Sequence, residues 1–233
     1  MIRLSVHPDP EAVAQAAAAR IAAAIAVAQS ARGTAHVSLA GGNTPRRTYE
    51  LLARLLADRE HVDWWFGDER CVPPDDPSSN YRLVAESLLA VAHIPTDRVH
   101  RVHGEDPPQV AAAAYGEELE QIVPPNENGL PVLDVALLGL GEDGHTASLF
   151  PGDPALEVTG ALAIAVVAVK PPPNRITLTL PVLRAAREVI ILATGAGKRD
   201  AVARVLARPD AATPASLLAD ANVTLVIDQE AAP

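Results

Sequence analysis

Residues 132–152 read VLDVALLGLGEDGHTASLFPG and hold the strongest structural signal in the chain. The segment 132–138 is apolar except for Asp134, which is the pattern of a strand buried on both faces of a parallel sheet. Three glycines follow within six residues, and they leave backbone N–H groups uncovered and permit positive φ. Asp143 and His145 therefore lie at the carboxyl end of a strand, where open α/β sheets bind ligands. We predict a functional site here.

This glycine loop has two competing interpretations. Its spacing, G-x-G-x-x-G over residues 139–144, matches the dinucleotide fingerprint, which also requires a following helix and an acid about 20 residues on. Pro151, Gly152 and Pro154 prevent a long helix, which argues against a nicotinamide or flavin site. A purely structural turn explains the glycines but not the Asp-Gly-His that ends them. A lone His is more often structural, but an Asp two residues before it favours a catalytic interpretation.

The composition limits the class of protein. A hydrophobic content of 48% over 233 residues is ample for a core, and 3% aromatic residues imply an interior of Ala, Val and Leu. The net charge of −10 argues against nucleic acid or an anionic membrane as a partner. The single Cys71 excludes an internal disulfide and fits a reducing compartment. We expect a cytoplasmic protein.

The beginning of the chain does not indicate membrane insertion. Residues 1–4 lack a basic segment followed by an apolar stretch and a cleavage site. The segment 12–31 is rich in Ala, but Gln15, Arg20 and Gln29 interrupt it. Because a membrane span needs about 20 predominantly apolar residues, we interpret this segment as an amphipathic surface helix.

Apolar runs typical of strands alternate with helical segments along the chain. Strand-like runs occupy 2–6, 36–40, 62–66, 98–102, 132–138, 161–169, 176–180, 189–193 and 223–227, and helical patterns occupy 10–30, 45–57, 80–91, 105–122 and about 199–206. There is no internal repeat and no long linker. The pattern predicts a single three-layer α/β/α domain over residues 1–233, a Rossmann-like, mostly parallel sheet with helices on both faces.

Polar residues follow other predicted strands as well. Gly41-Gly42-Asn43-Thr44-Pro45 precedes a helix, with Thr44 as its expected N-cap and Pro45 at its first position. A glycine pair before a helix N-terminus favours an anion, although a tight turn without a ligand is the alternative. The cluster Asp68-Glu69-Arg70 can likewise be a set of solvated ion pairs.

Several standard catalytic motifs are missing or incomplete. Gly195 to Lys198 is not a P-loop, because Leu192 stands at the first glycine and Arg199 at the required Ser/Thr. There is no G-x-S-x-G elbow of a serine hydrolase. His100-x-x-His103 has no Cys or acid at ligand spacing, which argues against a metal site.

Three longer phrases carry a family resemblance: FGDERCVPPDDPSSNYR (66–82), GEDGHTASLFPG (141–152) and KPPPNRITLT (170–179). Together with the glycine pair they resemble the 6-phosphogluconolactonases, the soluble family of the oxidative pentose phosphate pathway, over nearly the whole chain. The glycine pair and the Asp-Gly-His are shared with glucosamine-6-phosphate isomerase/deaminases. Two positions depart from the family pattern: Ala40 stands where Ser is frequent, and Glu142, which adds a negative charge, stands where Pro is frequent.

The resemblance implies hydrolysis of 6-phospho-D-glucono-1,5-lactone to 6-phosphogluconate without a metal or an organic cofactor. His145 is then the general base, because an imidazole with the ordinary pKa of about 6.5 is suited to this role at neutral pH. Asp143 orients the imidazole or the water. Backbone N–H groups around Gly41-Gly42 or Gly141 are candidates for the oxyanion hole.

The resemblance also implies a phosphate site between Arg70 and Lys198, near the helix terminus at Thr44-Pro45, with Arg175 as a second candidate. Asp68 and Glu69 are expected to hold Arg70 in place rather than to contact an anion. The candidate substrate-binding residues are Gly41, Gly42, Asn43, Thr44, Asp68, Arg70, Arg175 and Lys198.

Two rival functions remain at this stage. An amino-sugar phosphate isomerase/deaminase has the same glycine loop, but those relatives read Asp-Glu-Tyr where this chain has Asp68-Glu69-Arg70. A non-catalytic sugar-phosphate binding module is the other rival, and the presence of both Asp143 and His145 argues against it. We expect a small sugar phosphate lactone as the partner, and a monomer or a weak dimer.

Overall fold

A computed structural model describes residues 2–233 and contains a six-stranded sheet in which every neighbouring pair is parallel. Its strands, in spatial order, are β1 (Arg3–His7), β9 (Val223–Asp228), β8 (Val189–Ala193), β5 (Val135–Gly139), β2 (Ala35–Leu39) and β3 (Val62–Phe66). The apolar runs predict these strands well, because a strand covered on both faces has no polar side to interrupt the run.

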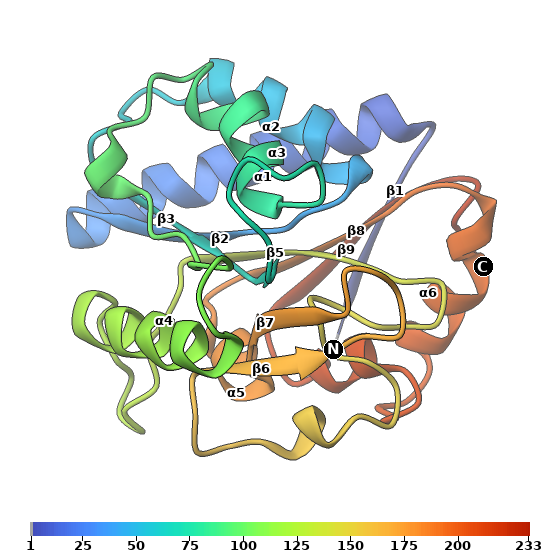
Figure 1. Cartoon of the computed structure of the whole chain (residues 1–233). Coiled ribbons are helices and arrows are strands. Elements are labelled where there is room, and N and C mark those ends of the chain that lie inside the picture. The colour runs from blue at the N-terminus through green and yellow to red at the C-terminus, as the bar shows by residue number, and fades with distance from the viewer. Residues whose placement is uncertain (1) are drawn as a thin grey trace.

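Helices cover both faces of this sheet, which confirms the predicted three-layer α/β/α fold (Figure 1). One layer holds α1 (Pro10–Arg32), α2 (Asn43–Leu55) and α3 (Asn80–Val84), which continues as a π-helical turn over Ala85–Leu89. The other layer holds α4 (Pro108–Ile122), α5 (Leu180–Ala185) and α6 (Arg199–Leu206). Short 3-10 turns occur at Thr96–Arg98, Pro154–Glu157, Ala196–Lys198 and Pro214–Leu218.

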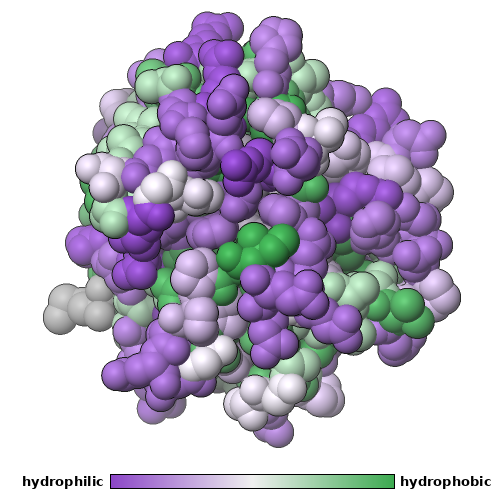
Figure 2. Space-filling model, turned by 90° about the vertical axis from the view of Figure 1, so that its left-hand side faces the viewer, coloured by the Kyte–Doolittle hydropathy of each residue, from purple (hydrophilic) through white to green (hydrophobic). Residues whose placement is uncertain are grey.

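Within residues 2–233, helix α1 alone has the length and apolar composition that a membrane-crossing helix would need. In the fold one of its faces is buried against the sheet through residues that include Val13, Ala17, Ile21 and Ile25, while its other face is exposed. It is therefore a covering helix of the core, as the interruptions in its apolar pattern predict. The molecular surface on the left of Figure 1 is mostly hydrophilic, with apolar side chains in small separate patches (Figure 2).

A second, smaller sheet is the main feature that the sequence pattern did not predict. Strands β4 (Asp68–Arg70), β7 (Asn174–Leu178) and β6 (Ala163–Val167) pair antiparallel. Gly67 connects the two sheets: its N–H donates to the Leu39 carbonyl (2.9 Å) and its carbonyl accepts from the Leu178 N–H (2.9 Å). The chain therefore leaves the main sheet at the end of β3 and enters the small one at once.

One local prediction is wrong and a second holds in part. Residues 98–102 form no strand: a 3-10 turn ends at Arg98, and one isolated bridge joins Val99 to Trp64. The segment lies beside the outer strand β3, where the His100 N–H donates to the Trp64 carbonyl (2.9 Å) and Arg98 Nη1 donates to Asp63 Oδ1 (3.2 Å). The helix expected over 80–91 contains the π-helical turn and is followed by His93 at φ 52°.

A buried ion cluster lies near the amino end of β3. The His100 ring stacks on Trp65 (4.1 Å between centroids), its Nδ1 lies 2.7 Å from Glu118 Oε1, and its Nε2 lies 3.6 Å from Asp63 Oδ1. Burial alone lowers the pKa of His100, but the two carboxylates outweigh it and raise the pKa to about 9. His103 instead faces Glu105. Within residues 2–233, no three His, Cys, Asp or Glu side chains are arranged to hold a metal ion.

This cluster makes stability depend on pH. Because the folded pKa of about 9 exceeds the ordinary value of 6.5, protonated His100 stabilises the fold fully below that ordinary value and loses this effect as pH rises through about 9. We expect the unfolding free energy to fall between about pH 7 and 9.5 more steeply in the native chain than in His100→Gln. Urea unfolding across this range measures it, and parallel pH profiles of the two proteins would contradict the assignment.

Candidate active site

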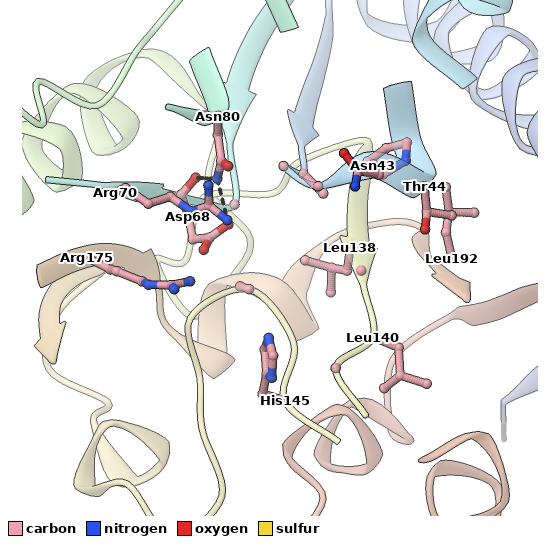
Figure 3. A pocket seen from close by; sticks show the side chains of 18 of the residues that line it. Asn43, Thr44, Asp68, Arg70, Asn80, Leu138, Leu140, His145, Arg175 and Leu192 are labelled. Atoms are coloured by element: carbon pink, nitrogen blue, oxygen red, sulfur yellow. Dashed lines mark hydrogen bonds between the residues drawn. The ribbon is translucent and has the colours of Figure 1, made fainter. Parts of the chain in front are cut away.

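A pocket of about 340 Å³ lies at the carboxyl ends of β2, β3, β5 and β8 (Figure 3). It is the place where the sequence pattern predicts a site, because parallel strands all end at one edge of a sheet. Every predicted site residue except Asp143 lines it: Gly41, Gly42, Asn43, Thr44, Asp68, Arg70, His145, Arg175 and Lys198. The structure therefore brings together segments from five parts of the chain.

His145 and Asp143 form a hydrogen-bonded pair on the loop after β5. Asp143 Oδ1 lies 2.6 Å from His145 Nδ1 and accepts the His145 backbone N–H at 3.1 Å. Burial alone raises the pKa of Asp143, but these two hydrogen bonds outweigh it and lower the pKa below its ordinary value. An ionised carboxylate can only accept, so in the neutral imidazole Nδ1 carries the proton and Nε2 is the atom with the free lone pair. This is the tautomer that a general base at the pocket needs.

Gly141 is required for this pair to form. A Cβ at this position would lie 2.1 Å from His145 Nδ1 and 2.5 Å from Asp143 Oδ1, so any side chain displaces both groups. The Gly141 N–H donates to the His145 carbonyl (2.8 Å) and is therefore unavailable to a substrate, which removes it from the oxyanion candidates. Glu142 does not line the pocket: its carboxylate lies near Gly197, and its carbonyl accepts from an arginine of α6 (2.7 Å).

The glycine pair forms the N-terminus of α2. The helix begins at Asn43 rather than Pro45, and Gly42, at φ 96°, is its N-cap. The prediction that Thr44 caps the helix is wrong, because its hydroxyl lies inside the first turn and 3.5 Å from that of Thr194. Within residues 2–233 the N–H groups from Gly41 to Thr44 have no acceptor. They provide unpaired donors and the positive end of a helix dipole at the pocket.

Arg70 and Arg175 are directly opposite each other on β4 and β7. Like charges in this position destabilise a sheet, and no carboxylate among residues 2–233 forms an ion pair with either. Burial and the nearby Arg70 lower the pKa of Arg175. Arg70 donates from Nη1 to the Ser78 carbonyl, while its Nε is buried without a partner. This arginine pair (Arg70 and Arg175) has the charge and the free donors that an anion requires.

The acids beside Arg70 do not hold its guanidinium, contrary to expectation. Glu69 is buried, its pKa is raised by burial, and it accepts the backbone N–H groups of Arg70 and Asn80 (both 2.7 Å). Asp68 accepts from Ser148 Oγ (2.5 Å) and from Asn80 Nδ2 (3.1 Å). The alternation of β4 turns Glu69 away from the face shared by Asp68 and Arg70, whereas the Asp68 carboxylate is engaged by Ser148 and Asn80. Sequence reasoning missed Asn80, whose amide packs directly on Gly41.

Lys198 reaches the pocket from the turn after β8. A carboxylate that sequence reasoning missed, Asp228 at the end of β9, holds this turn. Both of its oxygens accept the Gly195 N–H (3.0 and 2.9 Å), and one accepts the Ala231 N–H (2.9 Å). No motif marks Asp228, because its role depends on β9 lying next to β8.

Two buried tyrosines hold the ends of β2 and β3. Tyr49, on α2, donates to the Ala40 carbonyl (2.6 Å) and accepts the Ala40 N–H (2.9 Å). Tyr115, on α4, does the same for Phe66 (2.9 and 2.7 Å). Each hydroxyl replaces the ladder partners that the backbone loses where the sheet opens into the pocket.

Comparisons with known proteins point to one family. A family model described as glucosamine-6-phosphate isomerases/6-phosphogluconolactonase matches residues 8–227. The 6-phosphogluconolactonase of Streptomyces coelicolor is 44% identical over 88% of this chain and 82% of its own, and that of Mycobacterium tuberculosis is 36% identical over 98% and 96%. The solved 6-phosphogluconolactonase of Trypanosoma brucei is 32% identical, with a TM-score of 0.86 over 99% of this chain and 97% of its own. A monomeric glucosamine-6-phosphate deaminase, 22% identical with a TM-score of 0.84, shares the fold.

The tyrosine contacts predict a stability effect next to the pocket. Tyr49→Phe leaves the buried N–H and carbonyl of Ala40 unpaired, and we expect it to lower the unfolding free energy by about 2–4 kcal/mol. Tyr81→Phe is the matched control, since within residues 2–233 the Tyr81 hydroxyl makes no hydrogen bond. Urea unfolding measures both, and equal losses in the two variants would contradict the proposed role of Tyr49.

Proposed function

The chain belongs to the glucosamine-6-phosphate isomerase/6-phosphogluconolactonase family, and we propose that it hydrolyses 6-phospho-D-glucono-1,5-lactone to 6-phosphogluconate in the oxidative pentose phosphate pathway. Within the family it is a hydrolase of the lactonase branch, as its identity to the curated lactonases indicates. The observation that best supports this reaction is one pocket that joins a histidine with a free Nε2 to two arginines that form no ion pair with a carboxylate of residues 2–233. A base for water and a site for a phosphate are what this substrate requires.

The proposed chemistry begins with a water molecule between His145 Nε2 and the lactone carbonyl. His145 takes a proton from the water as the oxygen bonds to C1, and the carbonyl becomes a tetrahedral oxyanion. The oxyanion then collapses, the bond between C1 and the ring oxygen breaks, and His145 returns its proton to that ring oxygen. Asp143 keeps the imidazole oriented and stabilises its positive charge between the two proton transfers.

The N–H groups at the start of α2 are the proposed oxyanion donors. Those of Gly41, Gly42 and Asn43 are unpaired within residues 2–233, and the helix dipole adds positive potential at this place. Donors that are already aimed at the developing charge need no reorganisation during the reaction, which is why such an arrangement can lower a barrier by about 3–4 kcal/mol.

The substrate phosphate is proposed to bind at the arginine pair, with a contribution from Lys198, which also lines the pocket. A dianion removes the repulsion between Arg70 and Arg175, and a guanidinium can give two parallel hydrogen bonds to phosphate oxygens. Arg175 is therefore proposed to contribute to phosphate binding as much as Arg70 does, rather than as a secondary candidate. Asp68, which also lines the pocket, is suited to accept a hydrogen bond from a sugar hydroxyl rather than to contact the phosphate.

We further propose that the enzyme acts in the cytoplasm as a monomer or a weak dimer, without nucleic acid or membrane. The net charge of −10 and the single cysteine support this setting.

The role of His145 predicts a defect in turnover. We expect His145→Gln to lower kcat about 10²–10⁴-fold with little change in KM, because the variant keeps a polar side chain but lacks the base. His103→Gln, outside the pocket, is the matched control and should keep full activity. The assay generates the lactone in place with glucose-6-phosphate dehydrogenase, contains EDTA throughout and subtracts spontaneous hydrolysis. Undiminished turnover in His145→Gln would exclude the base role, and turnover of glucosamine 6-phosphate instead would favour the isomerase.

The arginine pair predicts a defect in binding. We expect Arg70→Met and Arg175→Met each to raise KM about 10–100-fold, since each removes charge-assisted hydrogen bonds to the phosphate. Lys198→Met should have a smaller effect, because a lysine supplies only a point charge. Arg101→Met, whose ion pair with Glu105 lies outside the pocket, is the control. An unchanged KM in Arg175→Met would exclude the arginine pair as the phosphate site.

A further inference from the structure

Phe150 lies between the proposed base and the proposed phosphate site. Its ring centroid is 4.9 Å from that of His145, and the Arg175 guanidinium carbon lies 5.7 Å from the same centroid. The first contact is a tilted ring pair and the second is within the range of a cation–π interaction. One side chain therefore contacts both functional ends of the pocket, although it does not line the pocket itself.

A second contact joins the same two structural units. Ser148, two residues before Phe150, donates from Oγ to Asp68 Oδ2 (2.5 Å), and its N–H donates to Thr177 Oγ1 (3.3 Å). Asp68 and Thr177 are cross-strand partners on β4 and β7, as Arg70 and Arg175 are. The loop that carries His145 is thus attached to the small sheet that carries the arginine pair.

We infer that Phe150 is a positioning residue that transmits phosphate binding at Arg175 to the orientation of the His145 imidazole. This inference rests on the lactonase function proposed above. Without an anion, Arg70 and Arg175 repel each other, and nothing but carbonyl oxygens and the Phe150 ring fixes the Arg175 guanidinium within residues 2–233. A phosphate fixes the guanidinium, the guanidinium fixes the ring, and the ring restricts the imidazole that packs against it.

The consequence is that the phosphate increases the rate as well as the affinity. Binding energy from a part of the substrate that does not react can be used to orient the reacting groups, and it then raises kcat. The Phe150 ring touches the proposed base, His145, directly, whereas Ser148 contacts only the small sheet.

The test supplies the substrate in two pieces. The enzyme hydrolyses D-glucono-1,5-lactone, which lacks the phosphate, in the presence and absence of inorganic phosphate, and the enzyme-free rate at each phosphate concentration is subtracted. We expect saturating phosphate to raise kcat/KM of the native enzyme for this lactone about tenfold. Phe150→Tyr, which keeps the ring, should be activated equally.

Two variants that lack the ring, Phe150→Leu and Phe150→Met, should be activated less than about twofold, while their KM for the phosphorylated lactone changes little. Because Phe150 is only half-buried, these apolar replacements leave the core intact. Tyr81→Leu is the matched control, since it removes the ring that faces Arg101 at 5.9 Å in a cation–π pair outside this pocket. It should keep the full phosphate response.

The outcomes separate this inference from the function on which it rests. A native enzyme that is not activated by phosphate, or ringless variants that are activated as strongly as the native enzyme, would overturn the role of Phe150 while lactone hydrolysis stands. Failure of the native enzyme to hydrolyse the phosphorylated lactone would overturn the proposed function itself. The coupling is supported if phosphate activation is lost in Phe150→Leu and Phe150→Met but kept in Phe150→Tyr and in the control Tyr81→Leu.

Discussion

The fold depends on how backbone groups are satisfied where parallel strands end. At that edge the ladder stops, and a pocket can stay open only if buried side chains pair with the carbonyl and N–H groups that the ladder leaves. Tyr49 does this for β2 and Tyr115 for β3, each with one hydroxyl that both donates and accepts. Asp143 holds the turn after β5, and Asp228 holds the turn after β8. Each of these four strand ends and turns is therefore held by hydrogen bonds to a side chain.

Several polar groups that face the pocket lack a partner within the described part of the chain. Among residues 2–233 the first N–H groups of α2 and the Nε2 of His145 have no hydrogen-bond partner. Arg70 and Arg175 donate to backbone carbonyls, but no carboxylate in the same range forms an ion pair with either of them. Leaving donors unpaired and placing like charges opposite each other lowers local stability. A phosphorylated lactone would relieve each of these deficits, so the same features that weaken the empty fold favour the substrate and the transition state.

The predictions from sequence succeeded and failed for identifiable physical reasons. The buried strands β3 and β8 follow directly from apolar runs, because both of their faces are covered. The strand β4 was missed, since Asp-Glu-Arg has low strand propensity and is extended only because β7 pairs with it. The Gly141 N–H was wrongly offered as an oxyanion donor, because its use by the His145 carbonyl depends on how the loop folds back.

The sequence by itself determined the three-layer α/β/α fold, the glycines of the loops and the placing of Asp143 two residues before His145. These features depend on periodicity and on groups two residues apart, and such short-range relations are fully contained in the order of the residues. Only the tertiary structure decided that Arg70 faces Arg175, that Asp228 holds the Gly195 turn and that Phe150 contacts both Arg175 and His145. Those contacts join segments far apart in the chain, and their register is set by packing of the two sheets rather than by any local pattern.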